Sequence, residues 1–424
     1  MNDQYKNSRT AYIFEAAFEY FITIIISGAY LANLLTRTGI SDSLAGILSS
    51  FVSLACSAQF FSVLFIRTAK PVKRWVTLIT MLKLLLFVGL YCVPVMQVSQ
   101  TIKTLLVILF LLGGQLVANI AAPFKTNWLM SLVDSKHRGL FTATKEQISL
   151  VGGMLFSYLM GAVSDHYNNL GNADMAFKVC RITLIILGLF HLITLFAAKE
   201  PERAGAHAKA TTLPKAISCT FGNSTVRKLI LLNVLWSGFT WFSRSYFGTY
   251  EIKELGFSLT YVSLITMVSS LARILVSRYF GNLADKTSWA NMMTICFGIA
   301  ALGFFIQSFT APENGKVFFL IYSVLYSLSL AGINGGLINI VFDYVDESDR
   351  TAALGIKTAI GGVCGFLASI LGGKLLDIIQ ANGNAFLGHK IYAQQVLSFI
   401  TFLGILLILL YMKHTVLKLK RINA

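Results

Sequence analysis

Charged residues are scarce in this 424-residue chain, where Asp, Glu, Lys and Arg together make up 13%. Soluble globular proteins carry about 25%, so the composition argues against a water-soluble enzyme. Prolines are also few, only six, while 55% of the residues are hydrophobic, which excludes a disordered chain. The six cysteines form no Cys-x-x-Cys pair, so neither a disulfide framework nor a metal site is expected.

Two absent patterns narrow the function further. No Gly-x-x-x-x-Gly-Lys-Ser/Thr loop occurs, so ATP hydrolysis through that loop is not expected, nor is any cofactor. The histidines lie mostly in predicted loops or at helix ends, without a clustered acid, nucleophile or metal-ligand set, which argues against a membrane-embedded enzyme. They are His137, His166, His191, His207, His389 and His414.

Long apolar stretches are abundant instead, and the mean hydropathy is +0.69. A helix needs about 20 apolar residues to cross a bilayer, and only helices and closed barrels satisfy every backbone polar group in lipid. The stretches here are too long and too evenly apolar for barrel strands, so the sequence predicts an all-α membrane protein with twelve transmembrane helices. The predicted spans are 10–34, 43–66, 75–95, 104–133, 147–164, 179–198, 228–250, 258–280, 289–309, 317–342, 358–377 and 394–412.

The basic residues predict the orientation of these spans. Residues 1–9 are polar, and most Lys and Arg fall in the tails and loops that lie inside when the N-terminus is inside. Both termini are therefore expected in the cytoplasm, and short loops without targeting signals favour a bacterial inner membrane. The formal charge of +16 follows from this bias, so no nucleic-acid partner is expected.

The longest polar segment, 199–227, divides the spans into two groups of six. It is basic and rich in Ala and Thr, which is typical of a linker. The expected organisation is an N-terminal bundle over 1–198, a cytoplasmic linker, a C-terminal bundle over 228–412 and a cytoplasmic tail over 413–424.

The two bundles repeat one another, because 132–165 aligns without gaps with 344–377. Two parallel six-helix halves are typical of a large transporter class whose site lies between the halves, near the membrane midplane. The coinciding pairs are Asp134/Asp346, Arg138/Arg350, Lys145/Lys357, Gly153/Gly365, Ser157/Ser369, Gly161/Gly373 and Asp165/Asp377.

The loop after the eighth span carries the most specific motif, Gly281-Asn-Leu283-Ala-Asp285-Lys286. It is similar to the signature Gly-x-Leu-Ala-Asp-Arg/Lys of the major facilitator superfamily, which the chain resembles over essentially its whole length. The resemblance implies two pseudo-symmetric bundles and gating roles for Gly281, Asp285 and Lys286, since in that family the Asp locks a cytoplasmic gate. The first-half copy, near 67–75, keeps only its basic residues.

Two repeated charge pairs begin the fifth and eleventh spans, Asp134 with Arg138 and Asp346 with Arg350. They would suit a cytoplasmic charge network that breaks when the inner side opens. The alternative is that they are only helix-start acids and inner-side anchors.

Ionisable side chains inside the bilayer are costly, so each is a candidate site. On the first span, Glu15 and Glu19 share a polar stripe with Tyr30, which predicts a face turned to a wet cavity. Desolvation and a like-charged neighbour one turn away favour the protonated form of Glu19, so this residue is expected to carry a proton. The alternative for Glu15 is a simple pairing with Lys or Arg at the inner interface.

Arg244 on the seventh span stays charged at any accessible pH. With Trp241 beside it, we expect it to bind an anionic group or to act as the counter-ion of Glu19; the alternative is snorkelling to the outer interface. Lys83 in the third span is expected to snorkel or to pair. The other candidates for substrate binding or coupling are Gln115, Asn119 and Lys125 on the fourth span, Ser270 and Arg273 on the eighth, and Tyr326 on the tenth.

The sequence therefore predicts a secondary active transporter of a small anionic, zwitterionic or polyhydroxy solute. It would work by alternating access, as a monomer in the bilayer, coupled to protons or, alternatively, to sodium. The 32 Phe leave open a proton-driven multidrug or lipid-like exporter, although the fifth span lacks the Gly-Pro pair of the superfamily's antiporters. A third alternative is a non-transporting sensor or scaffold with the same fold.

Overall fold

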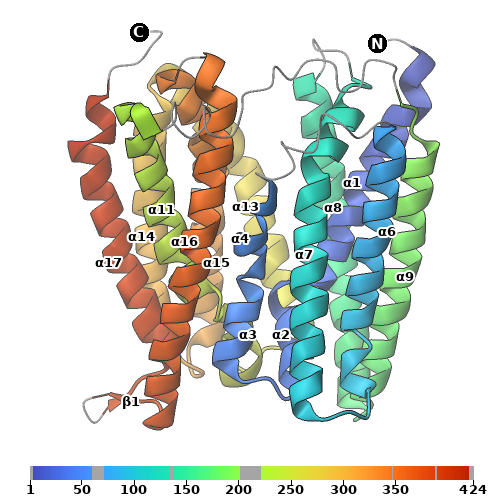
Figure 1. Ribbon diagram of the computed structural model, residues 1–424. Coiled ribbons are helices and arrows are strands. Elements are labelled where there is room, and N and C mark those ends of the chain that lie inside the picture. Colours follow the sequence, from blue (N-terminus) through green and yellow to red (C-terminus); the bar gives the residue numbers. More distant parts are fainter. Residues whose placement is uncertain are drawn as a thin grey trace. The chain divides into compact units, whose positions relative to one another are not determined.

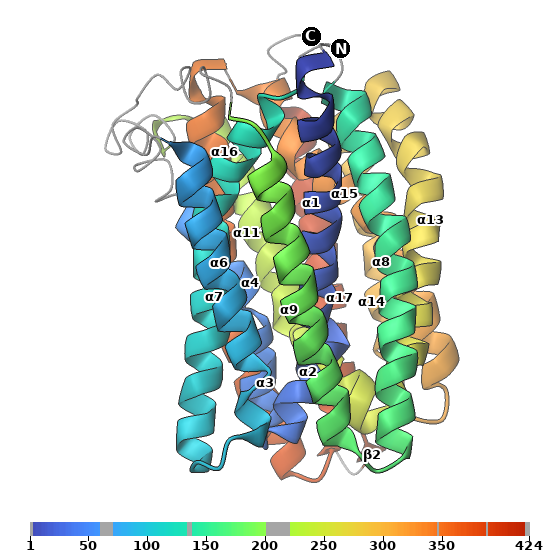
Figure 2. The same ribbon diagram turned by 90° about the vertical axis from the view of Figure 1, so that its right-hand side faces the viewer.

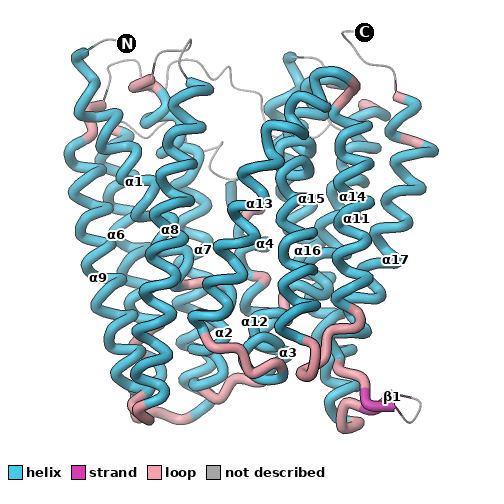
Figure 3. The backbone as a smooth tube through the Cα atoms, turned by 180° about the vertical axis from the view of Figure 1, so that it is seen from behind, coloured by secondary structure: helices cyan, strands magenta, loops and turns pink. Residues whose placement is uncertain are grey.

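The computed structural model describes residues 3–59, 71–133, 138–200, 221–345, 347–386 and 389–419. These residues are almost entirely helical, and they form two compact units (Figures 1 and 3). The exception within the described residues is a pair of two-residue antiparallel strands, β1 (Ala385–Phe386) and β2 (His389–Lys390). The expected all-α class is confirmed.

Unit 1 contains most of the N-terminal half of the chain. It takes in residues 1–41 and 58–210, and also 258–263, the beginning of a helix whose remainder belongs to unit 2. Its helices are α1 (Lys6–Ile25), α2 (Gly28–Arg37), α6 (Val72–Leu90), α7 (Gln100–Met130), α8 (Arg138–Asn169) and α9 (Ala173–Ala197), with 3-10 turns at Asp3–Tyr5 and Val93–Val95.

Unit 2 contains the C-terminal half and, in addition, residues 42–57, which include the first part of the second predicted span. A short π-helical turn, Tyr250–Glu254, follows its α12. Its helices are α3 (Asp42–Ser49), α4 (Phe51–Ala55), α11 (Ser224–Arg244), α12 (Phe247–Thr249), α13 (Leu259–Lys286), α14 (Trp289–Gln307), α15 (Gly315–Tyr344), α16 (Glu347–Ala381), α17 (Ala393–His414) and the 3-10 turn η5 (Val416–Lys418).

Eight of the described helices are long and apolar enough to cross a membrane, and α1 with α2 would make a ninth. These two helices bend by 40° where they meet. The bend lies at Ser27, which is extended, and Gly28, whose φ of +54° suits a residue without a Cβ. The remaining predicted spans correspond to α3 with α4, to α6 and to α11; α6 and α11 carry three basic residues each.

Small residues allow close helix contacts inside each unit. In unit 1, α1 packs against α8 and α9 (Figure 2), and a Cβ at Gly153 of α8 would overlap the Tyr20 ring of α1. In unit 2, α11 packs against α16, and a Cβ at Gly361 would overlap the side chain of Asn233. Both glycines therefore lie where two helices approach each other closely.

The end of α9 and the start of α6 are capped by side chains from each other's segments. Glu200 accepts hydrogen bonds from the first amides of α6, Val72 N at 2.8 Å and Lys73 N at 3.2 Å. The Lys73 ammonium in turn donates to the carbonyls of Phe196 and Ala198 at the end of α9. Both caps satisfy backbone groups that a helix end leaves unpaired.

Candidate functional site

A cluster of five ionisable side chains lies inside unit 1, and four helices contribute to it. Glu15 and Glu19 lie one turn apart on α1, so they share a face. Lys125 of α7 lies 2.8 Å from Glu15 Oε1 and also pairs with Glu19 Oε2. Lys83 Nζ of α6 lies 3.1 Å from Glu19 Oε1, and His191 Nε2 of α9 lies 2.9 Å from Glu15 Oε1.

The cluster is buried apart from one member. The Glu15 and His191 side chains are 2% and 0% exposed, whereas Glu19 is 32% exposed. Lys83 and Lys125 lie between these extremes, at 5% and 13%. Glu19 is thus the most exposed member of the cluster.

The charges of the cluster balance. Buried ions are tolerated when each is paired and hydrogen-bonded, and here two carboxylates face two ammonium groups. His191 Nδ1 has no hydrogen-bond partner in the described residues, so a second proton on this ring would be a buried, unsatisfied donor. With a neutral imidazole that donates to Glu15, the five side chains carry no net charge.

One of these residues, His191, was misjudged from the sequence. The histidines were expected mostly in loops or at helix ends without clustering, but His191 lies within α9 and is completely buried against Glu15. The missed signal is that an ionisable residue in the middle of an apolar span is itself a candidate. Lys83, expected to snorkel or to pair, forms a pair.

Glu15, Glu19 and His191 also offer three ligand atoms within 4.8 Å of one another, close enough for a metal ion. The ammonium groups of Lys83 and Lys125 lie against the same carboxylates, so a cation would have to displace them. The donor set therefore suits a charge network better than a metal.

The polar face of α7 continues from this cluster. Gln115 is buried, and its backbone carbonyl accepts a hydrogen bond from Asn119 Nδ2 at 2.9 Å. Asn119 Oδ1 accepts another from Gln59 Nε2 at 2.7 Å. Tyr30, predicted to share the polar stripe of Glu19, is buried instead, and its hydroxyl donates to the carbonyl of Ser157 on α8 at 2.7 Å.

Arg244 lies at the end of α11 in unit 2, on a stack of aromatic rings. Its Nη1 donates to Tyr326 Oη at 2.9 Å, and its guanidinium carbon lies 4.3 Å from the centroid of the Tyr326 ring. Tyr326 stacks on Trp236 and on Tyr322, and all three rings are buried while Arg244 is exposed. Trp241 packs against Gly365 of α16.

The remaining candidates are spread along α13 and the helix starts. Ser270 and Arg273 are half-buried on α13, as is Gly281, whereas Asp285 and Lys286 are exposed at its end. Arg138 and Arg350 lie in the first turns of α8 and α16, but their side chains are outside the described part of the structure, and so are Asp134 and Asp346 altogether.

The sequence matches the Major Facilitator Superfamily over residues 12–369 and again over 245–423. The chain belongs to this superfamily. No curated protein sequence matches it closely. The predicted membership, the twelve-helix fold and the general function as a multi-pass membrane transporter are thereby confirmed.

Solved transporters share the fold at low sequence identity. The nucleoside transporter NupG is 12% identical, with a TM-score of 0.72 over 98% of this chain and 100% of that one. A D-xylose–proton symporter is 14% identical, with a TM-score of 0.70 over 95% and 97%. An auto-inhibited POT family peptide transporter is 11% identical, with a TM-score of 0.68 over 96% and 97%.

Proposed function

We propose that this superfamily member is a secondary active transporter that moves a small organic anion together with a proton. The observation that carries the proposal is the neutral cluster in unit 1, in which Glu19 alone is substantially exposed. A zwitterion with a free carboxylate would satisfy the same requirement.

Coupling follows from charge balance. A proton on Glu19 neutralises that carboxylate and leaves Lys83 and Lys125 with only Glu15 as a counter-charge. An uncompensated charge in a poorly hydrated site costs several kcal/mol. An incoming carboxylate that takes the place of Glu19 on the two lysines restores neutrality, so proton and anion favour each other's binding.

Arg244 supplies the second proposed contact. It donates one hydrogen bond to Tyr326, and the other donors of a guanidinium can bind a carboxylate in a bidentate manner. The aromatic rings beneath it offer an apolar wall for the organic body of the solute. Ser270, Arg273, Gln115, Asn119 and Trp241 remain candidates for the same route.

Access to this route would alternate between the two sides of the membrane. The proposed inner gate includes Gly281, Asp285 and Lys286, at the end of α13, together with Asp134, Arg138, Asp346 and Arg350 at the starts of the fifth and eleventh spans. Both termini are proposed to lie in the cytoplasm of a bacterial inner membrane.

The test is transport into proteoliposomes that enclose a pH-sensitive dye. An inward proton gradient is applied, and mono- and dicarboxylates, amino acids, sugars and nucleosides are screened for uphill uptake. We expect an organic anion to accumulate with a stoichiometric proton flux and little dependence on membrane potential, because one proton accompanies one negative charge.

Glu19→Gln separates coupling from binding. This variant should bind the anion without uphill uptake, whereas Asp174→Asn, an exposed change at the start of α9, should behave like wild type. Normal gradient-driven uptake by Glu19→Gln contradicts the proposal. Uptake of many unrelated lipophilic cations would point to an exporter, and ligand binding without any flux would point to a sensor.

A further inference from the structure

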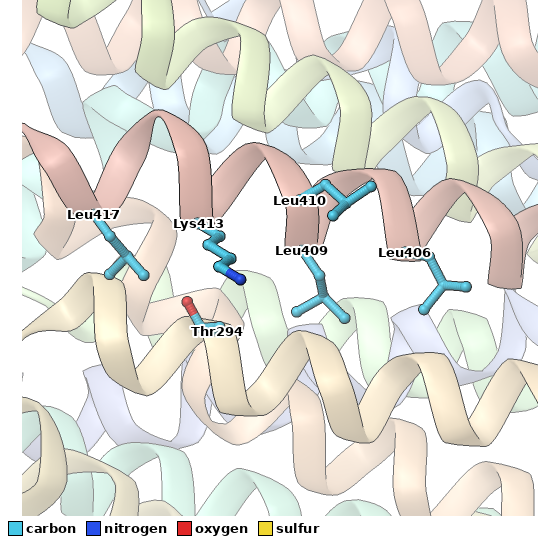
Figure 4. Close-up of a pocket in the computed structure, with 6 residues that line it drawn as sticks. All are labelled: Thr294, Leu406, Leu409, Leu410, Lys413 and Leu417. Atoms are coloured by element: carbon cyan, nitrogen blue, oxygen red, sulfur yellow. The ribbon is translucent and has the colours of Figure 1, made fainter.

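A groove on unit 2 is lined by leucines and ends at a lysine. It lies between α14 and α17, has a volume of about 600 Å³ and is lined by Thr294, Leu406, Leu409, Leu410, Lys413 and Leu417. In Figure 4 the Lys413 side chain is turned toward Thr294 across the groove, and the leucines extend along α17 on either side of it. We infer that this groove binds one anionic phospholipid.

The apolar part of the groove suits an acyl chain. Leu406, Leu410 and Leu417 are 37%, 54% and 37% exposed, so their side chains present an apolar surface that acyl chains can cover. From Leu406 to Lys413 the helix α17 rises by about 10 Å, and Leu417 in η5 continues the apolar surface beyond its end, so the groove can lie along part of one acyl chain. A free anion would leave this surface without a partner.

The polar end of the groove suits a phosphate. The Lys413 ammonium is exposed and offers three donors, while Thr294 Oγ1 already donates its own proton to the Ala290 carbonyl at 2.9 Å. Lys413 also lies in the last turn of α17, where the span meets the headgroup region. Basic pockets between transmembrane helices at that depth bind anionic headgroups.

The surrounding charge favours an anionic over a zwitterionic lipid. His414 follows Lys413 directly, and Lys418 lies one turn further in η5. Each Lys or Arg near an anionic membrane surface adds to the attraction for anionic lipids.

The experiment is a lipid titration of the full-length protein followed by native mass spectrometry. Phosphatidylglycerol should bind more tightly than phosphatidylethanolamine of the same chain length. Lys413→Gln should raise the dissociation constant for phosphatidylglycerol about five-fold, the equivalent of roughly 1 kcal/mol. Lys6→Gln, which removes an exposed basic residue at the start of α1, serves as the matched control and should change nothing.

Three outcomes overturn the inference. An equal loss in Lys6→Gln would mean that the lipid responds to overall charge and not to this groove. Unchanged binding in Lys413→Gln would remove the phosphate site. Displacement of the lipid by equimolar glycerol phosphate would mean that the groove is an anion site without a role for the leucines. The Leu409→Ala variant tests the role of the leucines directly.

Discussion

At the scale of single residues, the buried pairs around Glu15 set the energetics of the site. Glu15 is 2% exposed and accepts from both Lys125 and His191. A carboxylate buried to this extent depends on its partners, since desolvation disfavours the ion and pairing compensates for it. Each of its partners is therefore important for stability as well as for transport.

Lys125→Gln should destabilise the protein by about 3 kcal/mol or more, because it leaves a buried carboxylate without its ammonium partner. Thermal unfolding in detergent, followed by tryptophan fluorescence, measures the loss. Adding Glu15→Gln to the same chain should recover part of it. The exposed Lys178→Gln on α9 is the control, and an equal shift there would contradict the expected role of the pair.

Substitutions at Arg244 should separate charge from geometry. Arg244→Ala is expected to weaken anion binding about 10-fold or more, since a hydrogen bond to a charged group contributes roughly 1.5–3 kcal/mol. Arg244→Lys keeps the charge but loses the planar fork, so a smaller loss is expected. Isothermal titration with the solute found in the screen measures the affinity of each variant. Arg227→Ala, at the other end of α11, is the control. Wild-type affinity in both Arg244 variants would remove this residue from the site.

At the scale of helices, close packing at glycines holds each unit together. The Gly361 contact with Asn233 matters because Asn233 Nδ2 donates to the carbonyl of Lys357 at 2.9 Å, one turn earlier on the same helix. A side chain at this position must displace the amide and break the bond that ties α11 to α16.

Gly361→Val should therefore lower the unfolding temperature clearly, as overpacked core positions cost about 1–3 kcal/mol. Gly355 on the same helix is the matched control, because no atom lies within 4 Å of a Cβ built there. Gly355→Ala should be neutral or stabilising by about 0.5–1 kcal/mol, since alanine is the better helix former. If both substitutions have the same effect, the close contact is not what the glycine provides.

The helices were predictable from the sequence because the bilayer imposes one length and one composition on every span. The bend between α1 and α2 was not, since Gly28 in an apolar run is equally compatible with a straight helix. Glu15, Glu19 and Lys125 were each singled out from the sequence as ionisable side chains within a span, but their pairing with one another came from the structure. Which face of α9 and α6 turns inward depends on packing, so the role of His191 and the identity of the partner of Lys83 came only from the structure.

At the scale of the whole molecule, the net charge of +16 has a topological meaning. Basic residues resist translocation, so the side that keeps them is the cytoplasm. The orientation remains a prediction, and it determines on which side of the membrane the basic end of α17 lies.

A reporter fused after Ala424 tests this orientation. Green fluorescent protein at that position should fluoresce, because it folds in the bacterial cytoplasm, and alkaline phosphatase should stay inactive. The same two reporters placed after residue 98, in a predicted outer loop, provide the inverse control. Active phosphatase at the C-terminus would reverse the topology and place the proposed inner gate outside.

The caps around Glu200 have a mechanical consequence. Lys199 N donates a hydrogen bond to Ser8 Oγ of α1, and the Lys199 carbonyl accepts one from Trp128 Nε1 of α7. The Glu200 carboxylate accepts from the first amides of α6. A force that pulls on the chain beyond Glu200 therefore acts on several helices and not only on the end of α9. The load is shared among four helix ends, so a pull on the following segment would move the bundle as a block before it could unravel any one helix.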